Sequence, residues 1–207
     1  MLFRLGKKKS QEVAPQPWME EPYFSTFIKQ GIVWSELVKP PYGVTQHEWL
    51  ATNTRPFFNH INLIIAALSG SCTEQRCPSV PAGPRIEYFW LDGKGKKLKR
   101  LSAPQYFDYM DSFITEQLNN ETLFPTKHGN PFPKDFIAIC KKIYRLLFTA
   151  FTHVYLNHFE EVAALKLVAH LNTIFAHFIH FVDAYSLLDS KDYTTLDSYR
   201  CKILNLK

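Results

Sequence analysis

The sequence lacks any apolar run long enough to cross a membrane. Its most apolar stretches, residues 61–68 and 174–182, are too short or too rich in histidine to span a bilayer. Residues 1–10 contain no continuous apolar core of signal-peptide length, and Leu2 replaces the glycine that N-myristoylation requires. We therefore expect a soluble intracellular protein without a transmembrane segment, located in the cytoplasm with the nucleus as an alternative compartment.

The sequence also lacks the short motifs of the common enzyme classes. It has no G-x-x-x-x-G-K-[ST] phosphate loop, no G-x-G-x-x-G, no G-x-S-x-G nucleophile elbow and no H-E-x-x-H. No internal repeat occurs, and no change in composition divides the chain. We predict a protein that is not an enzyme, in which residues 1–20 form a flexible lead and residues 21–207 form one domain.

Negative charge is in the minority, since 24 Lys and Arg against 19 Asp and Glu give a formal net charge of +5. Much of the excess lies in residues 7–9 and 94–100. A mildly basic chain suits an acidic partner, a membrane surface or a nucleic acid. No base-stacking motif accompanies these runs, so we interpret them as solvated and expect no nucleic-acid partner. A basic nucleic-acid-binding module is the weaker alternative.

Helical spacing dominates what is present. Thr45 with Glu48 three residues later has the capping-box pattern, and apolar residues recur at helical spacing from there to residue 68. Pro56 predicts a kink or a second helix start within this segment. The same spacing occurs in residues 106–118, 134–158 and 160–188. Short connections between long amphipathic helices favour a helix bundle, so we predict a mostly α-helical fold.

A short stretch between these helices is typical of a β-hairpin. Residues 87–91 and 97–101 have strand-like composition and flank Asp92-Gly93, a dipeptide that supplies the positive φ angles of a tight turn. We therefore predict a small hairpin beside the bundle. The chain has 17 Phe and 10 Tyr, which predicts a core packed largely from rings.

Four residues have the composition of a zinc site. Cys72 and Cys77 lie five positions apart on a predicted loop, and His153 and His158 lie five apart near the end of a predicted helix. Intracellular thiols stay reduced, so paired cysteines favour a metal over a disulfide. Two thiolates and two imidazoles are a standard ligand set for structural zinc.

The histidine spacing leaves alternatives open. Five residues on a straight α-helix turn two side chains about 140° apart, so both can bind one ion only where the helix ends or bends. His170, His177 and His180 share one helical stripe and offer a rival metal face. Buried thiols and ordinary histidines are the alternative without a metal. A zinc-dependent hydrolase is the alternative function, but four protein ligands would leave no open position for a substrate.

Several longer motifs occur in order along the chain. They are His-Glu-Trp-Leu-Ala-Thr-Asn-Thr at 47–54 with Phe-Phe-Asn-His-Ile-Asn at 57–62, the cysteine loop at 72–78, Ala-Gly-Pro-Arg-Ile-Glu-Tyr at 82–88, Ser-Ala-Pro-Gln-Tyr at 102–106, Leu-Phe-Pro-Thr-Lys at 123–127 with Pro-Phe-Pro at 131–133, and Ala-His-Leu-Asn-Thr at 169–173 with His-Phe at 177–178. Together they resemble the Mob (Mps one binder) kinase-activator family, from about residue 22 to residue 188.

The resemblance implies a helix-bundle fold in which Cys72, Cys77, His153 and His158 bind one structural Zn²⁺. It also implies a function. Mob proteins are non-catalytic adaptors that bind the basic helical region preceding the catalytic domain of NDR/LATS-class AGC serine/threonine kinases, and they regulate kinase activity. We therefore expect the N-terminal regulatory region of such a kinase as the partner.

The resemblance further implies a kinase-binding surface that includes Glu48, Trp49 and His177. Trp49 and His177 are also candidates for ordinary core side chains. Residues 49–51 and the loop at 126–127 are closer to the branch that partners NDR-type kinases in cell polarity and morphogenesis signalling.

Some family members bind phosphothreonine peptides through three basic residues on the long helix. The corresponding positions here are Arg145, Leu146 and Thr149, so only Arg145 is basic. A dianionic phosphate normally needs several donors, which argues against phosphopeptide binding. Two positions of the partly acidic kinase face of the family are also changed, to Val44 and Pro56.

Overall fold

The computed structural model describes residues 16–83, 86–91, 101–127, 129–193 and 195–206 of the chain. In chain order the elements are η1 (Pro17–Met19), α1 (Trp34–Leu37), α2 (Gln46–Ala67), β1 (Val80–Gly83), β2 (Ile86–Tyr88), α3 (Ala103–Asn119), α4 (Phe136–Asn157), α5 (Phe159–Ala164), α6 (Val168–Ala184), α7 (Ser190–Tyr193) and α8 (Asp197–Leu204). The mostly α-helical fold with one small hairpin is confirmed. No helix of the described residues combines the length and the apolarity needed to cross a membrane.

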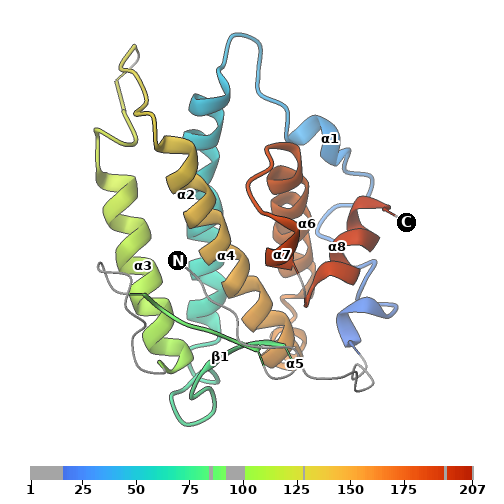
Figure 1. Cartoon of the computed structure of the whole chain (residues 1–207). Helices are drawn as coiled ribbons and strands as arrows, with labels where there is room; N and C mark the ends of the chain where they lie inside the picture. The colour runs from blue at the N-terminus through green and yellow to red at the C-terminus, as the bar shows by residue number, and fades with distance from the viewer. Residues whose placement is uncertain (1–15, 84–85, 92–100, 128, 194, 207) are drawn as a thin grey trace.

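The long helices α2, α3, α4 and α6 form the body of the molecule (Figure 1). α4 packs against both α2 and α3, and α6 packs against α2. Each of these helices has an apolar face, and burying those faces against one another stabilises the bundle. The bundle expected from helical spacing is therefore present.

Aromatic rings fill the core between α2, α4 and α6. The Phe57 ring on α2 lies 5.3 Å from Phe181 on α6, and the Tyr144 ring on α4 lies 5.7 Å from Phe178 on α6. All four side chains are buried. Tilted and edge-on ring contacts of this kind add to the free energy gained from burial alone. The ring-packed core predicted from composition is confirmed.

α2 begins at a capping box, as its sequence predicts. The Thr45 hydroxyl accepts a hydrogen bond from the Glu48 N–H at 3.3 Å, and the Glu48 carboxylate accepts one from the Thr45 N–H at 2.8 Å. The helix then continues through Pro56, so a second helix start there is wrong. Phe57 and several neighbours of Pro56 are buried, and this burial outweighs the one helix hydrogen bond that proline removes.

The predicted helical segment 160–188 is two helices rather than one. α5 ends in a turn in which Lys166 adopts a left-handed φ of 57°. The Leu167 N–H donates to the Val162 carbonyl at 2.9 Å and the Lys166 N–H donates to the Ala163 carbonyl at 3.0 Å. These two bonds form a Schellman motif, which usually has glycine where this chain has Lys166. The sequence therefore has no glycine here from which the end of α5 could be predicted.

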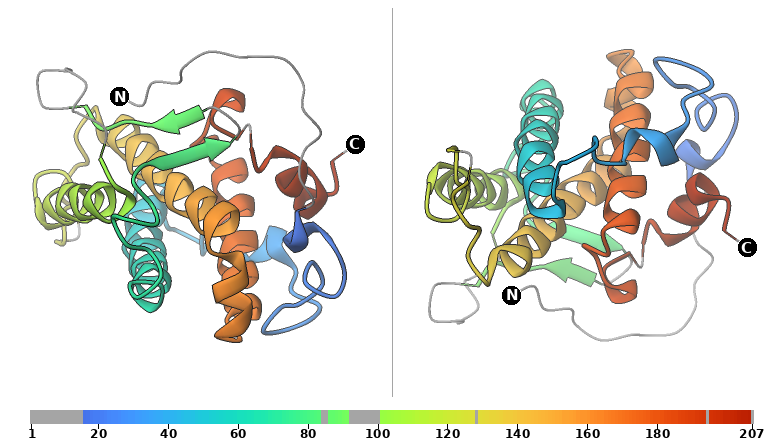
Figure 2. Two further views of the ribbon diagram at one scale, coloured as in Figure 1. Left: turned by 90° about the horizontal axis from the view of Figure 1, so that it is seen from below. Right: turned by 90° about the horizontal axis from the view of Figure 1, so that it is seen from above.

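The hairpin lies earlier in the chain than predicted. β1 pairs antiparallel with β2, with Val80 opposite Tyr88, and the pair lies across α4 (Figure 2). The prediction paired residues 87–91 with 97–101, whereas β2 contains residues 87 and 88 and pairs with β1. Residues 92–100 lie outside the described residues. β1 was missed because Pro81 argues against a strand, yet a two-stranded sheet consists only of edge strands, where proline is tolerated.

Residues 16–20, at the end of the predicted flexible lead, pack onto the domain. Trp18 in η1 is buried, and its ring lies 5.7 Å from Tyr155 of α4 and 5.7 Å from Phe159 of α5. Residues 1–15 lie outside the described residues, so the flexible lead stays a prediction for that part of the chain.

Candidate functional site

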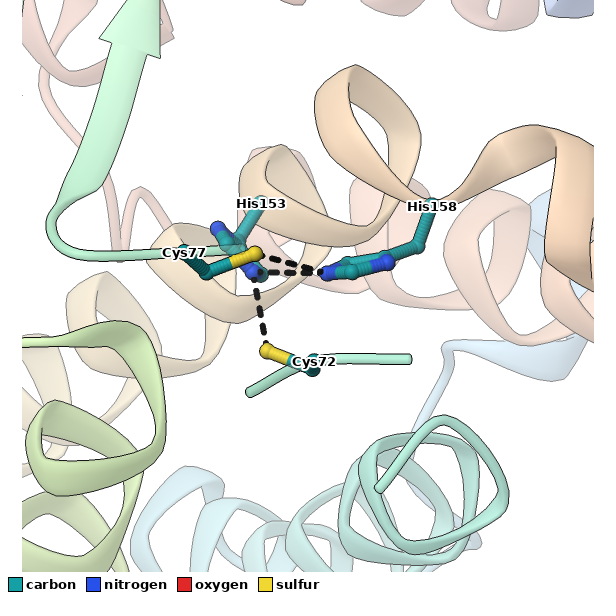
Figure 3. Close-up of side chains that lie close together, drawn as sticks. All are labelled: Cys72, Cys77, His153 and His158. Atoms are coloured by element: carbon teal, nitrogen blue, oxygen red, sulfur yellow. Dashed lines mark hydrogen bonds between the residues drawn. The ribbon is translucent and has the colours of Figure 1, made fainter. Parts of the chain in front are cut away.

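Separate parts of the chain bring the predicted metal ligands together. Cys72 follows α2, where its N–H donates to the Leu68 carbonyl at 2.8 Å, and Cys77 lies in the loop before β1. His153 projects from α4, and His158 lies at the junction of α4 and α5. Figure 3 shows the two thiols and the two imidazoles turned toward one another. All four residues are buried.

Three of the distances between the donor atoms are close to those around a tetrahedral ion, and all four atoms lie within 4.8 Å of one another. The Cys72 Sγ lies 3.3 Å from the His153 Nε2. The Cys77 Sγ lies 3.3 Å from the His158 Nε2, and the two Nε2 atoms are 3.2 Å apart. Zinc–nitrogen bonds of about 2.05 Å and zinc–sulfur bonds of about 2.3 Å at tetrahedral angles give N···N and S···N edges of about 3.3 and 3.6 Å. The residues therefore fit such an ion.

The end of α4 resolves the spacing of the two histidines. His158 is both the C-cap of α4 and the N-cap of α5, and its φ of −136° lies outside the helical region. His153 lies on the regular helix. The bend at His158 turns its imidazole back toward His153, so a five-residue spacing can serve one ion. The sequence predicted this requirement, and the structure satisfies it.

Burial sets the protonation states of these ligands. Desolvation, with a contribution from His158, lowers the pKa of His153 to about 3, so its imidazole is neutral and can bind a cation at pH 7. Desolvation, with a contribution from Cys77, raises the pKa of Cys72 to about 12, so the thiol keeps its proton unless a cation replaces it. A bound dication would displace such protons. The site is therefore suited to a divalent metal.

The rival histidine stripe does not form a second centre. Among the described residues, Cys72, Cys77, His153 and His158 form the one group of three or more histidine, cysteine or acidic side chains that could hold a metal ion. The rings of His177 and His180 stack instead on Trp34 of α1, at centroid distances of 6.4 and 5.7 Å. His170 is exposed.

Two of the three residues assigned to a kinase-binding surface, Trp49 and His177, contact α1 or its C-cap. Glu48 is in the first turn of α2, where its carboxylate takes part in the capping box. The Trp49 indole N–H donates to the Val38 carbonyl at 2.9 Å, at the end of α1, and His177 stacks on Trp34. Trp49 and His177 thus hold α1 against α2 and α6. Their contact with a kinase stays a prediction.

Sequence reasoning missed the outer side of α1. Val33 and Leu37 expose 61% and 47% of their surfaces, while Trp34 between them turns inward onto the histidines. Four-residue spacing places Val33 and Leu37 on one side of the helix. An element of only four residues is too short for a periodicity argument, so its two faces could not be separated from the sequence.

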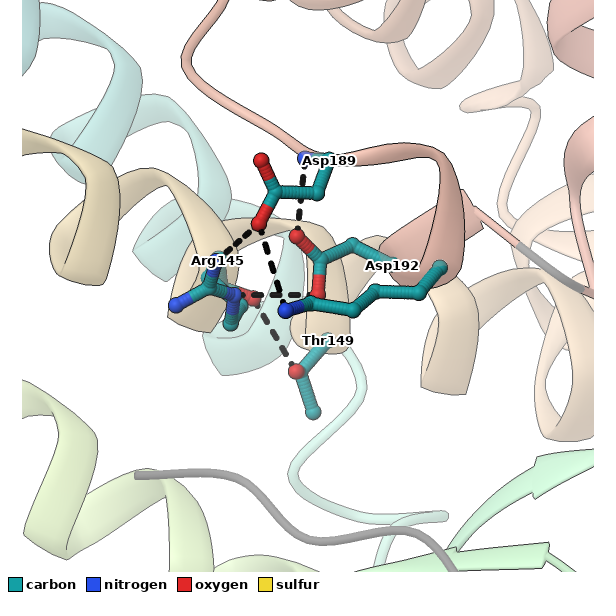
Figure 4. A network of polar contacts seen from close by, with 5 residues as sticks. Arg145, Thr149, Asp189 and Asp192 are labelled. Carbon is teal, nitrogen blue, oxygen red and sulfur yellow. Dashed lines mark hydrogen bonds and ion pairs between the residues drawn. The ribbon is translucent and has the colours of Figure 1, made fainter.

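The position expected to contact phosphate is already paired within the chain. The Arg145 Nε lies 3.0 Å from the Asp192 Oδ1, and its Nη2 lies 3.4 Å from the Asp189 Oδ2 (Figure 4). Leu146 is buried, and the Thr149 hydroxyl donates to the Arg145 carbonyl at 3.1 Å. None of the three positions therefore offers an unpaired cation.

Comparison with known proteins agrees with the motifs. The Mob1/phocein family pattern matches residues 25–196. The chain is 44% identical to MOB kinase activator-like 1A of Arabidopsis thaliana over 162 residues, which are 78% of this chain and 75% of that protein. It is 40% identical to MOB kinase activator-like 1 homolog A of Dictyostelium discoideum over 187 residues, 90% and 87% of the two chains. It is 44% identical to MOB kinase activator 3A of Homo sapiens over 156 residues, 75% and 72% of the two chains. The resemblance inferred from the motifs is confirmed: the chain belongs to the Mob1/phocein family.

Proposed function

We propose that this protein is a non-catalytic adaptor that binds the N-terminal regulatory region of an NDR/LATS-class AGC serine/threonine kinase and regulates its activity. Family membership carries the proposal, because relatives that match most of the chain are named MOB kinase activators. The role of a kinase-activating adaptor, rather than an enzyme, follows from the family as a whole. The class of kinase and the region bound are the finer parts of the proposal.

The surface at α1 supports a helical partner. Val33 and Leu37 form an exposed apolar pair, and the stacked Trp34 fixes the helix beneath them. Glu36 on α1 adds a carboxylate next to Leu37, and in the unbound protein it is paired with Lys39. An apolar pair beside an exposed carboxylate suits an amphipathic helix with one apolar face and a basic flank that replaces Lys39. The net positive charge of the whole chain does not oppose this, since charges farther than a Debye length, about 8 Å at physiological salt, are screened.

We propose that the metal is Zn²⁺ and that its role is structural. When bound, the ion would join the loop that carries Cys72 and Cys77 to the end of α4, where His153 and His158 lie. Four protein donors would fill a tetrahedral site, so the arrangement does not favour a hydrolase, which needs an open position for water or substrate. Zinc content of the purified protein, measured by mass spectrometry, tests this part.

We further propose that the adaptor acts in polarity and morphogenesis signalling, in the cytoplasm or the nucleus, without recognising phosphothreonine peptides. The motif at residues 49–51 and the loop at 126–127 support the signalling branch through their resemblance to relatives of that kind. The pairing of Arg145 with Asp189 and Asp192 supports the absence of phosphopeptide binding. Fluorescence microscopy of the tagged protein in cells, together with a tagged NDR-type kinase, shows whether the protein lies in the cytoplasm or the nucleus and so tests the proposed compartment.

The proposed partner can be tested by calorimetry. The zinc-loaded protein is titrated with the N-terminal regulatory segment of an NDR-type kinase at low and at high salt. We expect one-to-one binding that weakens as salt rises. Changing Val33 and Leu37 together to Ser is expected to weaken binding about tenfold or more, because both apolar contacts are lost while the charge of the surface stays the same.

The matched control is Leu63→Ser, since Leu63 on α2 is also exposed, at 68% of its surface. This variant should bind like the unchanged protein. If both variants weakened kinase binding equally, the binding surface would not lie at α1. No binding by folded, zinc-loaded protein would remove the NDR/LATS-class kinase as the partner. Trp49→Ala is unsuitable as the test variant, because it also breaks the hydrogen bond to Val38.

A further inference from the structure

The outer nitrogens of the two ligand histidines differ in their surroundings. Both imidazoles turn Nε2 toward the thiols, so a bound metal would leave Nδ1 of each ring with a proton. A metal-bound histidine normally donates that proton to an oxygen acceptor, which fixes the ring and strengthens the ligand. The His153 Nδ1 lies 3.3 Å from the Asn157 side-chain amide. The His158 Nδ1 is buried and has no hydrogen-bond partner.

A carboxylate stands one helical turn beyond the second histidine. The Glu161 Oε2 on α5 lies 3.9 Å from the His158 Nδ1, too far for a hydrogen bond but close enough to form one after a movement of about 1 Å. The Glu161 side chain is only 20% exposed, so water competes weakly for it. The neighbouring Glu160 is exposed.

An arginine from the cysteine loop holds this carboxylate in place. Arg76 directly precedes Cys77, and its Nη2 forms an ion pair with the Glu161 Oε1. The Arg76 N–H donates to the Thr73 hydroxyl at 3.3 Å, which fixes its backbone within the loop. The two carboxylate oxygens of Glu161 thus have different neighbours: Oε1 pairs with Arg76, and Oε2 faces the His158 Nδ1. The loop and the α4–α5 junction are therefore joined at a second place besides the ligands themselves.

We propose that Arg76 and Glu161 form a latch on the metal centre, in which Glu161 accepts the Nδ1–H of His158 and Arg76 holds the Glu161 carboxylate in position. The latch rests on the proposed metal. It positions His158 for the ion and ties that histidine to the cysteine loop. Because the ion can leave only when a ligand swings away, the latch slows metal release.

A surface ion pair without any role at the metal is the competing explanation. It predicts little effect on metal binding, because exposed ion pairs contribute little to stability and are screened. Negative charge in the first turn of α5 is a second competing explanation, since carboxylates stabilise helix N-termini. Glu160 occupies the same turn, so Glu160→Ala removes that effect without touching the latch and serves as the matched control.

The experiment measures zinc release from the full-length, zinc-loaded protein to a chromogenic chelator in excess. We expect Glu161→Ala to release zinc about 10–100 times faster than the unchanged protein, because removing such an outer hydrogen-bond partner lowers metal affinity by about that factor and the loss should fall on release. Glu161→Gln keeps an acceptor oxygen and should fall between the two. Arg76→Ala should accelerate release by a smaller factor, and Glu160→Ala should leave the rate unchanged.

A second measurement does not depend on the variants folding. In a ¹H–¹⁵N spectrum of the zinc-loaded unchanged protein, the His158 Nδ1–H should give a signal that exchanges slowly with water, because Glu161 accepts the proton. An Nδ1 proton in rapid exchange would overturn the latch. So would equal zinc release from Glu161→Ala and Glu160→Ala. If the purified protein binds no zinc at all, the proposed metal and the latch both fail. If it binds zinc but either of the preceding outcomes is found, the latch alone fails.

Discussion

Removal of the metal is expected to lower the melting temperature by about 8–16 °C. The ligands come from the end of α2, the loop before β1 and the end of α4, so only the folded chain presents them together. An ion that binds only the folded form, held at about 1,000 times its dissociation constant, adds about 4 kcal/mol to the free energy of unfolding. In a domain of this length each kcal/mol shifts the melting temperature by about 2–4 °C. The product gives the expected range.

The assay is a thermal melt of the same preparation in buffered zinc and after treatment with a chelator, with zinc content measured in parallel. Cys72→Ser should melt near the chelated protein whether or not zinc is added. Cys201→Ser is the control, because Cys201 lies on α8 outside the centre. An unchanged melting temperature in protein whose zinc content falls from one ion per chain to none would refute the structural role.

Three further outcomes are expected. Burial, with smaller contributions from His60 and His180, lowers the pKa of His177 to about 4, below its value of about 6.5 in an unfolded chain. The contribution of neutral His177 to the free energy of unfolding should therefore be fully present above about pH 6.5 and should be lost as the pH drops toward 4, with about 2 kcal/mol lost at pH 5. Urea unfolding at pH 7.5 and pH 5 measures this change. His177→Phe should lose less unfolding free energy between the two pH values than the unchanged protein. Thr45→Ala should lower the free energy of unfolding by about 1 kcal/mol through loss of the α2 cap, whereas Thr45→Ser should not. A phosphothreonine peptide should bind no more tightly than its unphosphorylated form, and a clear preference for the phosphorylated peptide would contradict the pairing of Arg145 with the two aspartates.

The residues of the candidate metal site were predictable from their residue types together with the resemblance to the Mob family. Cys72 and Cys77 are the paired thiols of the chain, and both histidines lie near the end of a strongly periodic segment. The bend at His158 could be stated only as a requirement, because the cap of α4 carries no proline or glycine that marks it. Residue pattern proposed the donors and left rival histidines open, the family resemblance selected among them, and tertiary packing brought the four side chains together.

The errors have physical causes that recur. Lys166 takes a left-handed turn that usually has glycine, because Val162 before the turn and Val168 after it gain more free energy from burial than the turn costs. Pro56 stays inside α2 and Pro81 stays inside β1 for similar reasons of packing and edge position. Local propensity is the weaker effect where residues nearby in the chain are held in the core.

The proposed metal centre also bears on the order of folding. Each sulfur faces an imidazole 81 residues further along the chain. Closing a flexible loop of that length costs about 4 kcal/mol of chain entropy, so the cysteine loop and the end of α4 rarely meet in the unfolded chain. Contacts between residues this distant in sequence form slowly. We therefore expect the ion to bind late, after α2 and α4 have docked, as a check that the two helices have met in the correct register.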